Sequence, residues 1–227
     1  MRVGIKKFRN NGFTLAEVLI TLAIIGVIAA ITIPTLLQNK QEQELKIAFK
    51  KTYSELAQAT QRVIHDNGGT MVGICPTSSP DCLKDKYEAY LNIIKSCISS
   101  QANGNCWYDN DGSSKYLSGN PKTDWSDNAT LMLNNGSVVR ISMYDIECKS
   151  DKFSPKGDCG AFIVDVNGLK KPNIVGKDIF YIHLHKDGIA PWGNADDDTN
   201  NSSRSATCIN KTTGFGCAAL VLQDVDY

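Results

Sequence analysis

Residues 13–37, FTLAEVLITLAIIGVIAAITIPTLL, form the longest apolar stretch of this 227-residue sequence. The 20 residues from 18 to 37 carry no charge. A helix of that length spans about 30 Å, which is the thickness of the hydrocarbon core of a bilayer. The sequence therefore predicts a membrane-spanning helix near the N-terminus.

The segment that precedes this helix, residues 1–12, reads MRVGIKKFRNNG. It holds four of the 24 basic residues and none of the 24 acidic ones, so residues 13–227 have a net charge of −4. Because basic flanks stay on the cytoplasmic side of a membrane, we expect the remainder of the chain to lie outside the cytoplasm. The overall charge of zero gives no indication of a nucleic-acid partner.

One acidic residue, Glu17, lies near the start of the apolar stretch. A carboxylate at bilayer depth costs about 2.5–3.5 kcal/mol unless it is paired or neutralised. The clearest boundary before the stretch is between Gly12 and Phe13, and cleavage there would leave a new ammonium group on Phe13. That ammonium is a natural partner for Glu17 of a neighbouring subunit in a dry helix bundle.

Residues 5–37 resemble the prepilin leader of type IV pilins and type II secretion pseudopilins. The resemblance rests on Gly12, the aromatic Phe13, the acidic Glu17 and about 20 apolar residues, with Pro34 interrupting the helix. It implies cleavage after Gly12 by a prepilin peptidase, N-methylation of Phe13, and assembly into a filament whose core contains these helices. The implied partners are copies of this chain, other pilins or pseudopilins, an assembly ATPase and a membrane platform protein.

Two other interpretations of the N-terminus stay open. A secretory signal cut after Ala30 would release a soluble domain, but ordinary signals carry no acid such as Glu17 in their apolar core. An uncleaved membrane anchor would leave Glu17 unexplained. A third, functional alternative is an anchored extracellular binding module or adhesin, either a minor pilin or a stand-alone surface protein.

The helical pattern continues beyond the membrane segment, because Leu45, Phe49, Leu56 and Val63 recur at helical spacing. Gly68-Gly69 is a typical end for this amphipathic helix. The predicted organisation is a leader, a membrane or filament-core helix, an amphipathic helix and an extracytoplasmic head, at residues 1–12, 13–37, 38–69 and 70–227.

The head domain combines helical and strand patterns. Residues 83–98 have a helical period, and residues 99–128 read as an irregular segment rich in Gly, Asn, Ser and Asp. Strand-like runs surround Asn135-Gly136, which is a strong hairpin signal. Further strands are predicted at 161–166 and 179–185, which gives about four, mostly antiparallel.

The predicted fold class is therefore α+β, pilin-like, with a long N-terminal helix packed on a small antiparallel sheet. The tail, residues 214–227, is interpreted as a short helix, with a last strand as the alternative.

All eight cysteines lie in the head, at Cys75, Cys82, Cys97, Cys106, Cys148, Cys159, Cys208 and Cys217. An even number in an exported domain indicates disulfides. Pairing of neighbours would close loops of 7, 9, 11 and 9 residues. Zinc is the alternative, but the sequence has no C-x-x-C and no His–Cys spacing typical of a zinc module.

The segment from Asp165 to Asp178 combines Asp, Asn, Gly and Pro residues and resembles a segment common in pseudopilin-like proteins. Its candidate calcium ligands are Asp165, Asn167, Asn173 and Asp178. A hydrogen-bonded turn is the favoured alternative, because Asp and Asn commonly bond their own backbone. The acidic cluster Asp196-Asp197-Asp198 reads as a solvated loop.

No catalytic motif was found, so we expect no enzymatic activity and no cofactor other than the calcium considered above. His183 and His185 share one face of a predicted strand; a polar sheet face is favoured over a metal site. The predicted function is that of a filament subunit, located in a bacterial inner membrane and then in a periplasmic or cell-surface filament.

Overall fold

The computed structural model describes residues 12–126, 128–151, 154, 156–194, 204–225 and 227. The chain divides into two units, Met1–Gln43 and Glu44–Tyr227. Helix α1, Leu15–Asp66, contributes to both units. The second unit is the head, and it has an α+β architecture.

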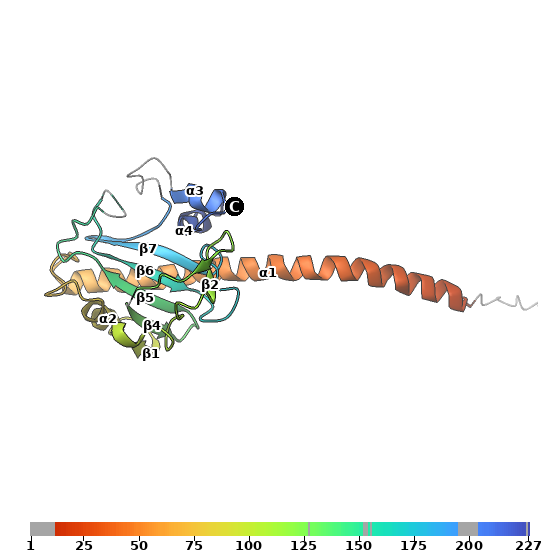
Figure 1. Cartoon of the computed structure of the whole chain (residues 1–227), viewed down its shortest axis with the longest axis horizontal. Coiled ribbons are helices and arrows are strands. Elements are labelled where there is room, and N and C mark those ends of the chain that lie inside the picture. Colours follow the sequence, from red (N-terminus) through yellow and green to blue (C-terminus); the bar gives the residue numbers. More distant parts are fainter. Residues whose placement is uncertain (1–11, 127, 152–153, 155, 195–203, 226) are drawn as a thin grey trace, which may run out of the picture. The chain divides into compact units, whose positions relative to one another are not determined.

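The head is built on an antiparallel sheet with the strand order β1-β4-β5-β6-β7-β8 (Figure 1). The strands are β1 Ile93–Cys97, β4 Ala129–Leu133, β5 Val138–Met143, β6 Gly160–Asp165, β7 Ile179–His185 and β8 Gly188–Pro191. A separate two-stranded sheet pairs β2 Ser114–Lys115 with β3 Pro121–Lys122. The short helices are α2 Pro80–Glu88, η1 Ser99–Gln101, α3 Arg204–Ile209 and α4 Cys217–Leu222.

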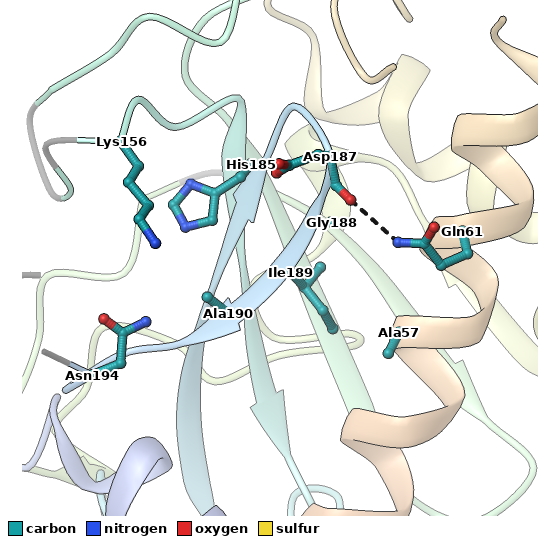
Figure 2. A pocket seen from close by; sticks show the side chains of 9 residues that line it. All are labelled: Ala57, Gln61, Lys156, His185, Asp187, Gly188, Ile189, Ala190 and Asn194. Carbon is teal, nitrogen blue, oxygen red and sulfur yellow. Dashed lines mark hydrogen bonds between the residues drawn. The ribbon is translucent and has the colours of Figure 1, made fainter. Parts of the chain in front are cut away.

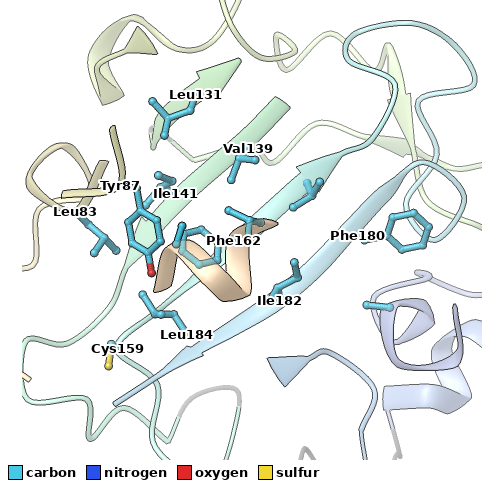
Figure 3. Close-up of a cluster of buried hydrophobic side chains, with 14 of the residues drawn as sticks. Leu83, Tyr87, Leu131, Val139, Ile141, Cys159, Phe162, Phe180, Ile182 and Leu184 are labelled. Carbon is cyan, nitrogen blue, oxygen red and sulfur yellow. The ribbon is translucent and has the colours of Figure 1, made fainter. Parts of the chain in front are cut away.

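One face of the main sheet packs against the head portion of α1 and against α2. Phe49 of α1 stacks on Phe180 of β7 with ring centroids 4.2 Å apart. Tyr87 of α2 meets Phe162 of β6 edge-on at 5.1 Å, at the centre of the cluster in Figure 3. Large buried apolar side chains of this kind each stabilise the fold by about 1.5–3 kcal/mol, so this cluster is the main core.

The opposite face of the same sheet is also covered. Trp107, Tyr108 and Trp125 are buried there against side chains such as Tyr181 of β7. They belong to the largely irregular segment 99–128, so buried aromatic side chains anchor this segment to the sheet. Because both faces are buried, strands β5, β6 and β7 have no exposed residue.

Several sequence predictions are confirmed. The hairpin turn lies at Asn135-Gly136, where Gly136 adopts a φ of 90° and Asn135 Oδ1 accepts the N–H of Ser137. Strands β6 and β7 match the predicted runs, and the tail forms the helix α4 rather than a strand.

The predicted helix over 83–98 is wrong in its second half. Helix α2 ends at Glu88, and Ile93–Cys97 form strand β1, paired with β4. The helical spacing was misleading because Ile94 and Ile98 do not join the core: they are 71% and 44% exposed. The estimate of about four strands was also too low, because β1 and the short edge strand β8 complete a sheet of six.

Candidate functional site

The start of helix α1 holds a reciprocal set of hydrogen bonds. The backbone N–H and the hydroxyl of Thr14 each donate to Oε2 of Glu17 at 2.8 Å. In return, the N–H of Glu17 donates to Oγ1 of Thr14 at 3.3 Å. With α1 beginning at Leu15, this is a capping box in which Thr14 is the N-cap and Glu17 the third helical residue.

This capping box adds a local role for Glu17. The carboxylate satisfies donors that the first helical turn would otherwise leave without partners. Its negative charge also lies at the positive end of the helix dipole. Thr14 was not identified from the sequence as a site residue, although the pattern Thr-x-x-Glu before an apolar run is its recognisable signal.

The helix surface beyond this start is apolar. The exposed large apolar side chains of this part are Phe13, Leu15, Val18, Leu19, Ile20, Leu22, Ile24, Ile25, Val27, Ile28, Ile31, Ile33, Leu36 and Leu37. Within the described part of the chain, α1 is the one helix long and apolar enough to cross a membrane. Such a surface is stable only when lipid or other apolar helices cover it.

Pro34 lies inside α1 and does not end it. The helix is thus not interrupted at Pro34, in contrast to the prediction. Proline has no N–H to donate to the carbonyl of Ala30, so the backbone ladder loses one bond there. The hydroxyls of Thr32 and Thr35 donate to the carbonyls of Ile28 and Ile31, at 2.9 and 3.4 Å, and lie on the two sides of this gap.

The predicted cleavage position falls at the edge of the described chain. Residues 1–11 of the predicted leader lie outside the described residues, as does Asp196-Asp197-Asp198. Phe13 is 89% exposed and precedes the first residue of the capping box. An ammonium group released on Phe13 would therefore form one residue before the backbone N–H that Glu17 binds.

The eight cysteines form four disulfides between sequence neighbours: Cys75–Cys82, Cys97–Cys106, Cys148–Cys159 and Cys208–Cys217. Each bond closes a local loop in the head. In the chain-entropy model, a loop of about ten residues stabilises a domain by roughly 2–3 kcal/mol.

The predicted calcium ligands come together around a turn, but their carboxylates already have donors. Asp178 accepts the N–H groups of Asn173 and Ile174, at 2.7 and 2.6 Å. Asp165 accepts the hydroxyl of Tyr108 on one oxygen and a backbone N–H on the other, from residue 167 at 3.1 Å. All four carboxylate oxygens are thus engaged by protein donors.

This arrangement does not fit a calcium ion, which needs six to eight oxygen ligands. Among the described residues, no group of three or more His, Cys, Asp or Glu side chains is placed to hold a metal. Asn167 Oδ1 is buried without a hydrogen-bond partner, which leaves one ligand-type oxygen uncommitted. The segment is better described as a turn held by Asp178 and Asp165.

Burial raises the pKa values of both carboxyl groups of this turn. It raises the pKa of Asp178 to about 6. Burial, together with the nearby charge of Asp178, raises the pKa of Asp165 well above its usual range. Tyr108 was not recognised from the sequence, and no local signal could have identified it, because it lies 57 residues away from Asp165.

His183 and His185 share a face of β7, as predicted, and a buried carboxylate joins them. Nδ1 of His183 lies 3.1 Å from Asp158 Oδ1, and Nδ1 of His185 lies 3.3 Å from the same atom. The two rings stack with centroids 5.4 Å apart. This buried trio orients His185 toward a cleft at the edge of the sheet (Figure 2).

One comparison with known families gives a match. Residues 7–33 match the family model described as the prokaryotic N-terminal methylation motif. The match includes Gly12, Phe13 and the capping box, and it ends just before Pro34. No curated protein and no solved structure shows significant similarity to this chain.

Proposed function

From the premise that residues 7–33 carry the prepilin signal of type IV pilins and pseudopilins, we propose that this chain is a filament subunit without enzymatic activity. The observation that carries the proposal is the coincidence of this motif with an apolar helix surface that nothing in the described chain covers. In the membrane, lipid covers that surface. In a filament, other copies of the helix cover it.

The first step is processing. A prepilin peptidase cleaves between Gly12 and Phe13 and methylates the new amine of Phe13. The uncleaved precursor spans the inner membrane with its head outside the cytoplasm, where the four disulfides can form. The capping box has its partners within the chain, so the precursor helix can begin at Leu15 before any neighbour arrives.

The second step is assembly. The ammonium of Phe13 pairs with Glu17 of an adjacent subunit as both leave lipid for the filament core, where an unpaired carboxylate would be costly. An assembly ATPase, a platform protein and other pilins or pseudopilins act with the chain in this step. The head forms the outer surface of a periplasmic or cell-surface filament.

The N-terminal mass of the protein from membranes of its own host tests the processing step. We expect a peptide that begins at Phe13 and carries one extra methyl group. A start at Ile31 would indicate secretory cleavage and contradict the filament function. A start at Met1, in a host with a prepilin peptidase, would support an anchored binding module instead.

The variant Glu17→Gln tests the assembly step. Glutamine also completes a capping box, so the variant keeps the helix start and removes only the charge. We expect normal cleavage and methylation, with filaments reduced at least tenfold in sheared fractions seen by electron microscopy. Thr14→Val is the matched control, because it weakens the cap and keeps the charge. Equal filament yields in wild type and Glu17→Gln would contradict the pairing.

A further inference from the structure

The two edges of the main sheet differ in how they are covered. At the β8 edge, the hydroxyl of Tyr53 in α1 donates to the carbonyl of Ile189 at 3.2 Å. Nε2 of Gln61, also in α1, donates to the carbonyl of Asp187 at 3.2 Å. The opposite edge is β1, Ile93–Cys97, whose ladder partner is β4 (Figure 1). The outer side of an edge strand carries N–H and C=O groups that can pair with another strand, so within the described chain β1 is the open edge.

The side chains along β1 are exposed and almost uncharged. Ile94 is 71% exposed, and Lys95 and Ser96 are exposed as well. Ile98 follows the strand with an extended backbone, φ −69° and ψ 159°, and is 44% exposed. Lys95 is the one charged residue between positions 89 and 108. Free edges are commonly protected by several charges or by proline, and β1 has neither.

Three of these side chains belong to one face of the strand. The hydroxyl of Ser96 bonds the carboxylate of Glu88, so Ser96 lies on the face that α2 covers. Because side chains alternate along a strand, Ile94 and Ile98 belong to the same face. A bulge at the start of β1 leaves Ile94 without a Cα partner on β4, and the pairing is regular from residue 95 to residue 97. The two isoleucines therefore flank Ser96 as an apolar pair along the open edge.

This pattern is self-complementary in an antiparallel register centred on Ser96. Ile94 of each copy then lies opposite Ile98 of the other, and Ser96 lies opposite Ser96. Lys95 lies opposite Cys97, so the two lysines do not oppose each other directly. A register centred on Lys95 would place like charges opposite each other, which is destabilising. A slip of one residue from the Ser96 register would separate the isoleucines from their partners.

We propose that β1 pairs with β1 of a second copy of this chain, in an antiparallel two-fold contact centred on Ser96. The contact joins two six-stranded sheets edge to edge and covers Ile94 and Ile98 of both copies. A two-fold contact uses the same surface on each copy, whereas contacts along a helical filament join two different surfaces. The pairing is therefore additional to filament assembly, and it does not depend on how the N-terminus is processed.

Cysteine cross-linking of the full-length chain in detergent tests the centre of the contact. The native cysteines are all paired, so each variant adds one reactive thiol. Ser96→Cys should form a disulfide-linked dimer on mild oxidation, because the two thiols oppose each other across the two-fold axis. Ser100→Cys, the same change beyond the strand, is the matched control and should give about tenfold less dimer. Equal cross-linking of the two variants, or none in Ser96→Cys, would overturn the proposal.

A mixture of Ile94→Cys chains and Ile98→Cys chains, tagged to differ in size, tests the register. The mixed dimer should be the main product. Neither variant should cross-link to itself, because equal positions of the two copies are then four residues apart along the strands, about 13 Å. Equal amounts of mixed and symmetric dimers would show random collision and contradict the register.

Ile94→Lys tests the pairing without a cross-link. It places two added charges in the contact and should weaken dimerisation about tenfold in analytical ultracentrifugation. Ile209→Lys, the same change at an exposed isoleucine outside β1, should leave dimerisation unchanged. Both variants should keep the wild-type unfolding midpoint, because these side chains are 71% and 58% exposed. Equal dimerisation of wild type and Ile94→Lys would overturn the proposal and assign the association to the apolar helix. A monomeric wild type would also overturn it and leave the edge to a strand of another protein.

Discussion

The two parts of helix α1 differ in how their apolar side chains are exposed. From Leu15 to Gln43 it exposes its apolar side chains in every direction. From Glu44 to Asp66 it buries one stripe, including Phe49 and Leu56, against the head. A single helix can therefore serve two environments when its apolar residues are continuous in one part and periodic in the other.

Truncation of one apolar side chain in each part of the helix tests this difference, and it has the largest effect that we expect. Phe49→Ala removes a fully buried ring from the core and should lower the free energy of unfolding of the head by about 3–5 kcal/mol. Ile24→Ala, on the bare part of the helix, should leave it unchanged. Denaturant unfolding followed by tryptophan fluorescence reports on the head alone, because all three tryptophans lie there.

If Ile24→Ala destabilised the head as much as Phe49→Ala, the two parts of the helix would not be energetically separate. The experiment should be done in detergent, which covers the apolar surface in both variants and in wild type.

A second contrast concerns the carboxylates of the two units. Glu17 lies on an exposed helix start, whereas Asp178 is buried in the head with its pKa raised to about 6. A raised pKa means that the folded state binds more protons than the unfolded state between about pH 4 and 6. The contribution of Asp178 to the free energy of unfolding is then fully present below about pH 4, and this contribution of about 3 kcal/mol is lost as the pH rises through 6.

Chemical unfolding of wild type and of Asp178→Asn at several pH values tests whether this contribution to stability falls as the pH rises. In wild type the free energy of unfolding should decrease between pH 4 and 6 because of Asp178, and the variant should lack this decrease. The measurement in EDTA and in millimolar calcium should give the same curves, because the carboxylates of the turn already have donors. A rise in stability with calcium in wild type alone would contradict our description of the turn and restore the calcium hypothesis.

A third contrast uses threonines, which occur in both parts of α1. Thr60 is fully buried, and its hydroxyl bonds the carbonyl of Leu56 at 2.7 Å and the hydroxyl of Tyr87 at 2.9 Å. Thr60→Val leaves a buried Tyr87 hydroxyl without this partner and should cost about 1–3 kcal/mol in the free energy of unfolding. Thr35→Val, on the exposed part, should cost the head nothing.

The double variant Thr60→Val with Tyr87→Phe provides the check. Removing both partners of a buried hydrogen bond is close to neutral, so the double variant should recover most of the loss. Additive losses in the double variant would show that the hydroxyls do not act as a pair.

The sequence predicted the parts of the fold that local patterns specify. The uncharged run to Leu37 identified the apolar helix, and Asn135-Gly136 identified the central hairpin. Strand β1 was missed because residues 91–98 happen to repeat at helical spacing, and only pairing with β4 reveals the strand. The short strand β8 contains Gly188 and Pro191, which give a weak strand signal.

The candidate site was predictable to the same extent. Gly12, Phe13 and Glu17 follow from a contiguous motif, which the methylation family model also matches. The contacts that hold the side chains of Asp165 and His185 in place could not be predicted. Their partners, Tyr108 and Asp158, come from distant segments of the chain. Such pairs depend on tertiary packing rather than on local sequence pattern.

The smallest expected effect concerns the capping box, which distinguishes the start of the bare helix from its interior. Thr14→Val removes the side chain that bonds the N–H of Glu17 and should destabilise the first turn by about 1 kcal/mol. Amide hydrogen exchange in the first turn should then be about fivefold faster in micelles. Thr14→Ser, which keeps the hydroxyl, should restore the wild-type rate. Thr21→Val removes a hydroxyl that bonds the Val18 carbonyl within the helix and should leave the first turn unchanged. If Thr14→Val had no effect on exchange, the helix start at Glu17 would not depend on its hydrogen bond to the hydroxyl of Thr14. The capping box would then contribute nothing to the stability of the first helical turn.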